Sequence, residues 1–218
     1  MIRALVISAA FAALAGPAFA GDLVVTVTKA DGAPLADAVV SLPAAPAAPA
    51  APGAPAAPGA PKPAFAWKQE IAQKDKTFMP FVLVTPVGAT VSFPNFDKFR
   101  HHVYSFSKGN KFELDLYGKD ETRSVAFRAV GTAALGCNIH DEMVAFVRVV
   151  DTPWVAKTDA SGRAEIKGAP DGKVRVSVWH PYAKGKDQSA AVDAVLSPDA
   201  AATVSVVIDV AAPRAHRH

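Results

Sequence analysis

The residues best suited to chemistry lie in one short segment, Gly136-Cys137-Asn138-Ile139-His140-Asp141-Glu142-Met143. This segment holds the only cysteine of the chain in a Cys-x2-His-x2-Met pattern, and the adjacent pair His101-His102 lies about 36 residues upstream. One thiolate, two imidazoles and a thioether form the donor set of a mononuclear copper site, with a trigonal His2Cys plane and a weak axial Met. The pattern therefore predicts that one upstream His joins Cys137, His140 and Met143 around a copper ion.

The same residues are compatible with other kinds of site. Cys137 and His140 can be a nucleophile and its base, but no orienting acid is identifiable in the sequence and Met143 would have no role. Cys137 can also be a buried core thiol beside a surface histidine. Zinc is a weaker prediction because it prefers Cys, His and carboxylate ligands. Asp141 and Glu142 are expected to be solvated loop acids, not a catalytic pair.

The choice between the two upstream histidines is ambiguous. Alternation along a strand places His102 with Tyr104 and Phe106 on one face that looks like a core face, and His101 on the other face. Strands near metal sites often contain a bulge, which shifts this alternation. We therefore favour His101 as the ligand and keep His102 as the alternative.

These side chains must be positioned by β-strands, because no window has a 3.6-residue apolar stripe over three turns. Short β-rich segments separated by turn residues favour an all-β fold of sandwiches or barrels. The expected strands are Leu23–Val27, Ala38–Leu42, Phe81–Val84, Thr90–Phe93, Val103–Phe106, Phe112–Leu116, Ser124–Phe127, Ala133–Cys137, Val144–Val150, Ala164–Ile166, Val174–Trp179 and Thr203–Val210.

Composition narrows the function classes. The chain has 218 residues, of which 50% are hydrophobic and 20% charged, so it can bury one large or two small cores and is too apolar to be wholly disordered. One cysteine excludes an internal disulfide and multi-cysteine zinc modules. The net charge of +3 is too small to indicate nucleic-acid binding.

The N-terminus, residues 1–20, is predicted to be a secretory signal peptide. Arg3 supplies the positive region, Leu5 to Leu14 the apolar region, and Ala18-Phe19-Ala20 the small-x-small cleavage site. We expect an exported, periplasmic protein that begins near Gly21, with no later segment long enough to span a membrane. A free thiol in such an oxidising compartment must be buried or bound to a metal.

Two further segments are expected to carry no chemistry. Residues 43–64 consist of 11 Ala, 8 Pro, 2 Gly and Lys62, so they are predicted to be a polyproline-rich linker. Residues 211–218 are predicted to be a frayed tail.

Residues 65–150 resemble a cupredoxin of the plastocyanin–amicyanin type. The resemblance rests on Val87-Gly88-x-Thr90-Val91-x-Phe93-x-Asn95, on His101-x-Val103 and on Gly131 to Met143. It is closer to exported plastocyanin-like proteins often labelled methylamine utilization protein, through His101 to Ser107 and Cys137 to Asp141. That label is inherited by resemblance and does not show that this chain handles methylamine.

The resemblance implies a Greek-key β-sandwich that binds one type 1 copper ion through His101, Cys137, His140 and Met143. It also implies that electrons leave through the exposed edge of His140, so the chain is an electron carrier and not an enzyme. In the family an Asn follows the first ligand His, and His102 departs from that pattern. Val144 and Phe146 are expected to exclude water from the site.

The flanks, residues 21–42 and 151–210, together resemble a carboxypeptidase regulatory-like (prealbumin-type) β-sandwich. The inference is one sandwich interrupted by another, and the alternative is an N-terminal strand pair packed beside the cupredoxin sheet. His180 is expected to be structural, with a second metal site or a partner contact as alternatives.

The sequence thus predicts a monomeric, exported blue copper protein that carries single electrons between periplasmic redox proteins, such as a dehydrogenase and a cytochrome. A copper-trafficking protein and an interaction module without a metal are the alternatives.

Overall fold

The structure, a computed structural model, describes residues 20–43, 65 and 67–211. Their regular elements are sixteen strands and one short 3-10 turn, η1 (Lys186–Gln188), so the all-β prediction is confirmed. No helix among these residues is long and apolar enough to cross a membrane. Apart from Ala20, Pro43 and Ala211, the predicted signal peptide, linker and tail lie outside the described residues.

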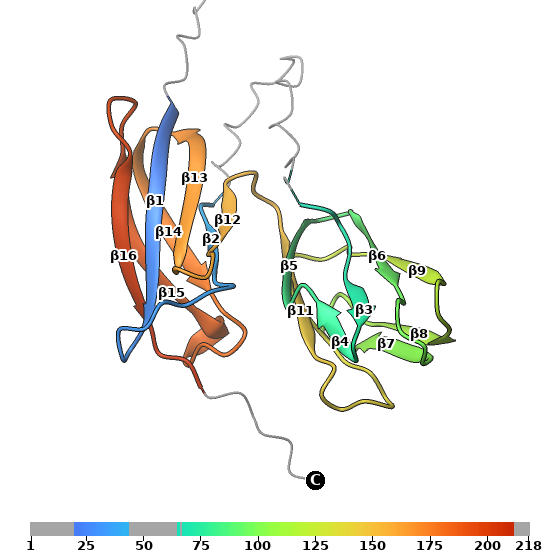
Figure 1. Ribbon diagram of the computed structural model, residues 1–218. Coiled ribbons are helices and arrows are strands. Elements are labelled where there is room, and N and C mark those ends of the chain that lie inside the picture. Colours follow the sequence, from blue (N-terminus) through green and yellow to red (C-terminus); the bar gives the residue numbers. More distant parts are fainter. Residues whose placement is uncertain (1–19, 44–64, 66, 212–218) are drawn as a thin grey trace, which may run out of the picture.

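The two flanks form one β-sandwich, shown in blue, orange and red in Figure 1. Its first sheet has the order β13-β1-β16 and its second the order β12-β2-β14-β15. Leu23, Val25 and Val27 alternate along the first strand with their side chains fully buried between the sheets. The strands are β1 (Ala20–Lys29), β2 (Val39–Ser41), β12 (Val155–Lys157), β13 (Arg163–Pro170), β14 (Gly172–Trp179), β15 (Ser189–Leu196) and β16 (Ala202–Ile208).

Thr158 joins the two flanks across a long stretch of sequence. Its hydroxyl donates to the Leu35 carbonyl at 2.7 Å and accepts from the Ala38 amide at 2.9 Å, and the residue is only 2% exposed. One apolar core contains buried side chains from both flanks, from Leu23 to Leu42 and from Ala164 to Ile208. The N-terminal strands therefore belong to this sandwich and are not an addition to the central unit.

The central unit is a second sandwich with a separate core that extends from Ile71 to Val149. Its strands form a sheet of order β10-β11-β5 and the pairs β3-β4, β6-β9 and β7-β8. Bridges from Tyr104 to Gly136 and from Gln73 to Asn95 link these groups. The strands are β3 (Ala72–Lys74), β4 (Thr77–Met79), β5 (Val82–Pro86), β6 (Thr90–Pro94), β7 (His101–Ser105), β8 (Phe112–Tyr117), β9 (Thr122–Ala126), β10 (Gly131–Leu135) and β11 (Ala145–Val150).

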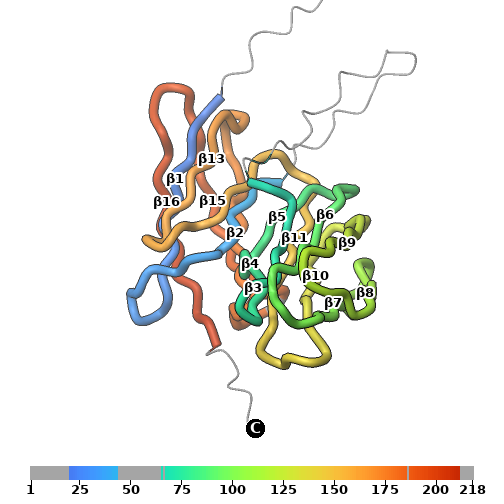
Figure 2. The backbone as a smooth tube through the Cα atoms, turned by 45° about the vertical axis from the view of Figure 1, so that its right-hand side comes forward, coloured from blue at the N-terminus to red at the C-terminus, as the bar shows by residue number. Residues whose placement is uncertain are grey.

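The two sandwiches pack side by side (Figures 1 and 2) through a third apolar cluster that includes Val39, Val82 and Trp179. The Lys157 ammonium donates to the Val82 carbonyl at 2.9 Å across this contact. Phe146 also faces the contact, with its ring 6.4 Å from that of Trp179. The expectation that Phe146 shields the metal site is therefore wrong, because its side chain points from β11 toward the other sandwich.

Four strands were not expected from the sequence: β3, β4, β12 and β15. The first three have only three residues each, too few for an alternating pattern. The fourth, Ser189–Leu196, is rich in alanine and has only one buried residue, so its hydrophobic signal is weak. It forms because β14, which is equally long, offers it a full antiparallel register.

Gly162 is predicted to be essential for the turn between β12 and β13. Its φ is +76°, and a Cβ there would lie 2.3 Å from the Val27 carbonyl oxygen. Gly162→Ala should lower the free energy of unfolding by about 3 kcal/mol, because strain and overpacking add. Gly32→Ala is the matched control, since its φ is +84° but its Cβ meets no atom within 4 Å. It should cost about 1 kcal/mol in urea unfolding, and equal losses in both variants would contradict the prediction.

His180 has a structural environment. Its side chain lies in the flanking sandwich, the residue is 6% exposed, and its Nδ1 accepts the Tyr182 amide at 3.2 Å. Burial lowers its pKa to about 4, so the ring is neutral in the folded chain above that pH. His180 is not part of the one metal-competent cluster found among the described residues.

The pKa of His180 predicts a pH dependence of stability. The unfolded chain takes up this proton near pH 6.5 and the folded chain only near pH 4, so the stability from this group is present above pH 6.5 and is lost as pH falls toward 4. In His180→Gln, urea unfolding at pH 7.5 and 4.5 should show a smaller loss of stability between the two than the unaltered chain. An equal loss would refute this role.

Candidate metal centre

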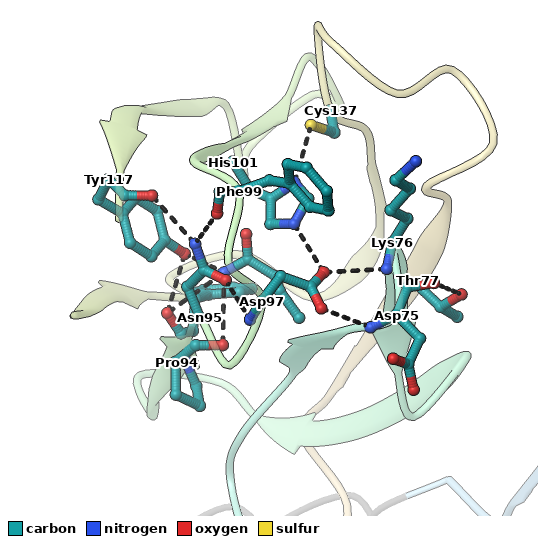
Figure 3. Close-up of polar contacts among 12 residues, drawn as sticks. Asp75, Lys76, Thr77, Pro94, Asn95, Asp97, Phe99, His101, Tyr117 and Cys137 are labelled. Atoms are coloured by element: carbon teal, nitrogen blue, oxygen red, sulfur yellow. Dashed lines mark hydrogen bonds and ion pairs between the residues drawn. The ribbon is translucent and has the colours of Figure 1, made fainter. Parts of the chain in front are cut away.

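One thiol and two imidazoles converge in the central sandwich. The candidate ligand atoms of His101, Cys137 and His140 all lie within 4.8 Å of one another. Cys137 Sγ lies 4.0 Å from His101 Nδ1, as Figure 3 shows. His101 is fully buried and Cys137 is 3% exposed, whereas His140 is partly exposed. The structure thus brings together three of the side chains that the sequence singled out.

The strand β7 presents His101, not His102, to this cluster. The pairing of β7 with β8 shifts register between His101 and Val103, as a bulge would produce. His101, Val103 and Ser105 are fully buried, whereas Phe106 is 68% exposed. The alternation argument that placed His102, Tyr104 and Phe106 on the core face is therefore wrong, since the core face is the opposite one.

His102 has a different partner. Its Nε2 lies 3.0 Å from Glu113 Oε1 on β8, and its ring contacts Tyr104 at 5.7 Å between centroids. Glu113 is largely exposed, with 59% of its side chain accessible. His102 is thus buried, at 6% exposure, but it faces Glu113 and is not part of the cluster.

Met143 lies in the same buried core as Cys137 and is fully buried. Its backbone amide donates to the His140 carbonyl at 3.0 Å, which closes the turn between the two residues. The loop between β10 and β11 therefore carries Cys137, His140 and Met143 within one turn-containing segment, with the Met143 thioether directed into the core.

His140 lies on the solvent side of the cluster that it forms with His101 and Cys137. Its ring centroid lies 5.0 Å from that of His101 and 6.3 Å from that of Phe99. Burial lowers its pKa, and the nearby His101 adds to this effect. Its Nδ1 is buried and has no hydrogen-bond partner among the described residues. A buried imidazole nitrogen without a partner is costly, and a metal ion would satisfy it.

Asp97 is a functional residue that the sequence did not identify. Its carboxylate accepts a hydrogen bond from His101 Nε2 at 2.8 Å, which leaves His101 Nδ1 on the side of Cys137. An acid four residues before a histidine was the available signal. This spacing is a weak signal, because an irregular loop, and not a helix or strand, brings the Asp97 carboxylate to the His101 ring.

Asp97 also bears on the nucleophile alternative. In space, Cys137 lies next to His101 and His101 lies next to Asp97. This is the order of a nucleophile, its base and the acid that orients the base. The distance of 4.0 Å from sulfur to nitrogen is longer than the hydrogen bond expected of such a pair, and the residue that carries the sulfur is only 3% exposed. This geometry suits an ion between the two atoms better than attack on a substrate.

The donor set fits copper. The three grouped side chains supply one sulfur and two imidazoles, with no carboxylate among them. A soft thiolate with imidazoles suits copper, and the trigonal His2Cys arrangement is the one such sites use. Asp97 supplies the outer carboxylate that typically orients a metal-binding histidine.

No protein-family model matches the chain. No curated protein matches it either. Among solved structures, the copper-containing nitrite reductase NirK from Thermus scotoductus SA-01 is 27% identical with a TM-score of 0.37, and the match covers 39% of this chain and 23% of that one.

Two smaller copper proteins are also similar to part of the chain. A reduced mutant of amicyanin is 21% identical with a TM-score of 0.36, covering 37% of this chain and 80% of its own. A purple cupredoxin from Nitrosopumilus maritimus is 22% identical with a TM-score of 0.34, covering 37% of this chain and 98% of its own. Each of these similarities covers less than two fifths of the chain.

The two upstream histidines should differ in metal binding. His101→Gln should weaken Cu(II) binding by about a hundredfold, because one imidazole of the cluster is lost, whereas His102→Gln should weaken it by less than about threefold. Competition with a chromophoric chelator measures both. A larger loss in His102→Gln would reverse the assignment.

Proposed function

We propose that this chain is an exported blue copper protein that carries single electrons between periplasmic redox partners. The observation that carries the proposal is the convergence of His101, Cys137 and His140 within 4.8 Å in a buried part of the central sandwich. A bound copper ion would supply reversible exchange between Cu(II) and Cu(I). His101, Cys137 and His140 would hold it, together with Met143.

The burial of the donors supports electron transfer over catalysis. His101 and Met143 are fully buried and Cys137 is 3% exposed, so these side chains offer little open surface to a substrate. His140 alone is partly exposed and thus offers the shortest route between the cluster and the surface. A rigid, water-poor donor set changes little between oxidation states, which favours fast electron exchange.

Each residue has a distinct part in this role. Cys137 supplies the thiolate, whose deprotonation the metal would drive. Asp97 fixes the ring of His101, and the buried Nδ1 of His140 is free to bind. Val144 flanks the ligand loop next to Met143, where an apolar side chain helps to exclude water.

Location and partners follow from the sequence. The predicted signal peptide, residues 1–20, supports export to the periplasm, where a dehydrogenase and a cytochrome are the kinds of protein that would exchange electrons with it. The Ala/Pro-rich residues 43–64 would link the flanking sandwich to the central unit, and the flanking sandwich would hold that unit in place.

The colour of the copper-loaded protein tests this proposal. The unaltered chain should be intensely blue, because charge moves from the thiolate to Cu(II) on absorption of light, and Cys137→Ser should abolish the absorption completely. Met143→Leu is the control, since it should remain blue with a shifted reduction potential. A colourless Cu(II) form of the unaltered chain would refute the type 1 site.

Voltammetry separates electron transfer from copper trafficking. An electron carrier should give one reversible wave and retain its copper against a chelator for hours. Release of copper within minutes, without a reversible wave, would instead identify a trafficking protein that uses the same ligands.

A further inference from the structure

The carboxylate of Asp97 lies at the meeting point of two irregular segments. It belongs to the segment between β6 and β7, and the residue is 8% exposed. Besides the His101 ring, it accepts the backbone amide of Asp75 at 2.6 Å and that of Lys76 at 2.9 Å, as Figure 3 shows. Three donors thus converge on one side chain, and together they hold it in a single orientation.

The two amides come from the turn of the β3-β4 hairpin. Asp75 and Lys76 have φ values of +54° and +57°, so both adopt the left-handed conformation of a type I′ hairpin turn. Neither residue is a glycine, and this conformation is unfavourable for such side chains. The two hydrogen bonds to Asp97 help to compensate that cost.

The backbone around Asp97 is fixed from the other side by Asn95. The Asn95 side chain accepts the Asp97 amide at 2.9 Å and donates to the carbonyls of Phe99 at 2.8 Å and Tyr117 at 3.1 Å. Asn95 is fully buried. The carboxylate is therefore anchored to β8 through its own segment and to the hairpin through its oxygen atoms.

This anchoring has a chemical consequence for His101. An ionised carboxylate only accepts hydrogen bonds, so the proton of the neutral His101 ring must be on Nε2. Nδ1 then carries a free lone pair, and this is the atom that lies 4.0 Å from Cys137 Sγ. The alternative tautomer would place a proton between the imidazole and the position of the ion.

We propose that Asp97 is a positioning residue that holds His101 in the Nε2-protonated tautomer, and that the β3-β4 turn is the element that holds Asp97. Its effect on copper binding rests on the proposed function, whereas its effect on the tautomer does not.

The tautomer can be measured without a metal. The ¹⁵N chemical shifts of His101 in the metal-free chain at neutral pH should show a protonated Nε2 and an unprotonated Nδ1. In Asp97→Leu, no oxygen faces Nε2, so the His101 ring should populate both tautomers. A single Nε2-protonated form in a folded Asp97→Leu variant would overturn the proposal.

The second carboxylate–histidine pair supplies a matched control. Glu113→Gln removes the charge that faces His102 Nε2 on the same strand pair, so it should leave the tautomer of His101 unchanged. If Glu113→Gln altered the His101 tautomer as much as Asp97→Leu does, a general electrostatic effect would replace the positioning role.

The turn is tested separately. Asp75→Asn combined with Lys76→Gly keeps both amide donors and favours the type I′ turn, so the tautomer should persist. Replacing the hairpin turn by a longer Gly-Ser loop removes the fixed donors, and the His101 ring should then populate both tautomers. A single Nε2-protonated form in the loop variant would show that the turn is not needed.

Copper binding completes the test. Asp97→Leu should weaken Cu(II) binding by about tenfold to a hundredfold and shift the visible absorption, whereas Glu113→Gln should do neither. A colourless unaltered chain would refute the blue copper function and leave the tautomer result standing. A blue unaltered chain with an unchanged tautomer and affinity in Asp97→Leu would refute the positioning role alone.

Discussion

The contact of the Cys137 sulfur with the His101 ring, inside a packed sandwich, is the constraint on which the rest of the site depends. Both residues are almost completely removed from water, and the sulfur lies 4.0 Å from His101 Nδ1, which is a weak hydrogen bond at best. Burial of polar atoms without good partners costs free energy in the metal-free chain. Binding of a soft ion would recover that cost.

Three elements of different kinds, a strand, a loop and a hairpin, hold the residues around this contact. The strand β7 carries His101 in a sheet, where a register shift turns its ring into the core. The loop between β10 and β11 carries the other donors within a closed turn. The β3-β4 hairpin supports the site from outside through Asp97. Donors from a strand and a loop are thus held together by backbone hydrogen bonds that neither element could make alone.

The flanking sandwich packs against the central unit and carries none of the three clustered side chains. Its strands come from both sides of the central unit in the sequence, and its core is separate from the core of that unit. The contact between the two units is apolar, with Lys157 bonded across it. Such a contact orients the central unit relative to the rest of the chain. It leaves the part-exposed His140 and the exposed rings of Phe96 and Phe99 outside the contact between the sandwiches.

The sequence by itself determined the all-β class, most strands and the residue types of the site, because alternation, turn residues and the Cys-x2-His-x2-Met spacing are local properties. Only the tertiary structure decided that His101 faces Cys137, that Phe146 faces the other sandwich and that Asp97 orients a histidine. Each of these depends on a bulge or on a loop that meets a distant hairpin, and neither leaves a periodic signal in the chain. Side-chain direction in such places is set by packing and by hydrogen bonds between segments far apart in sequence.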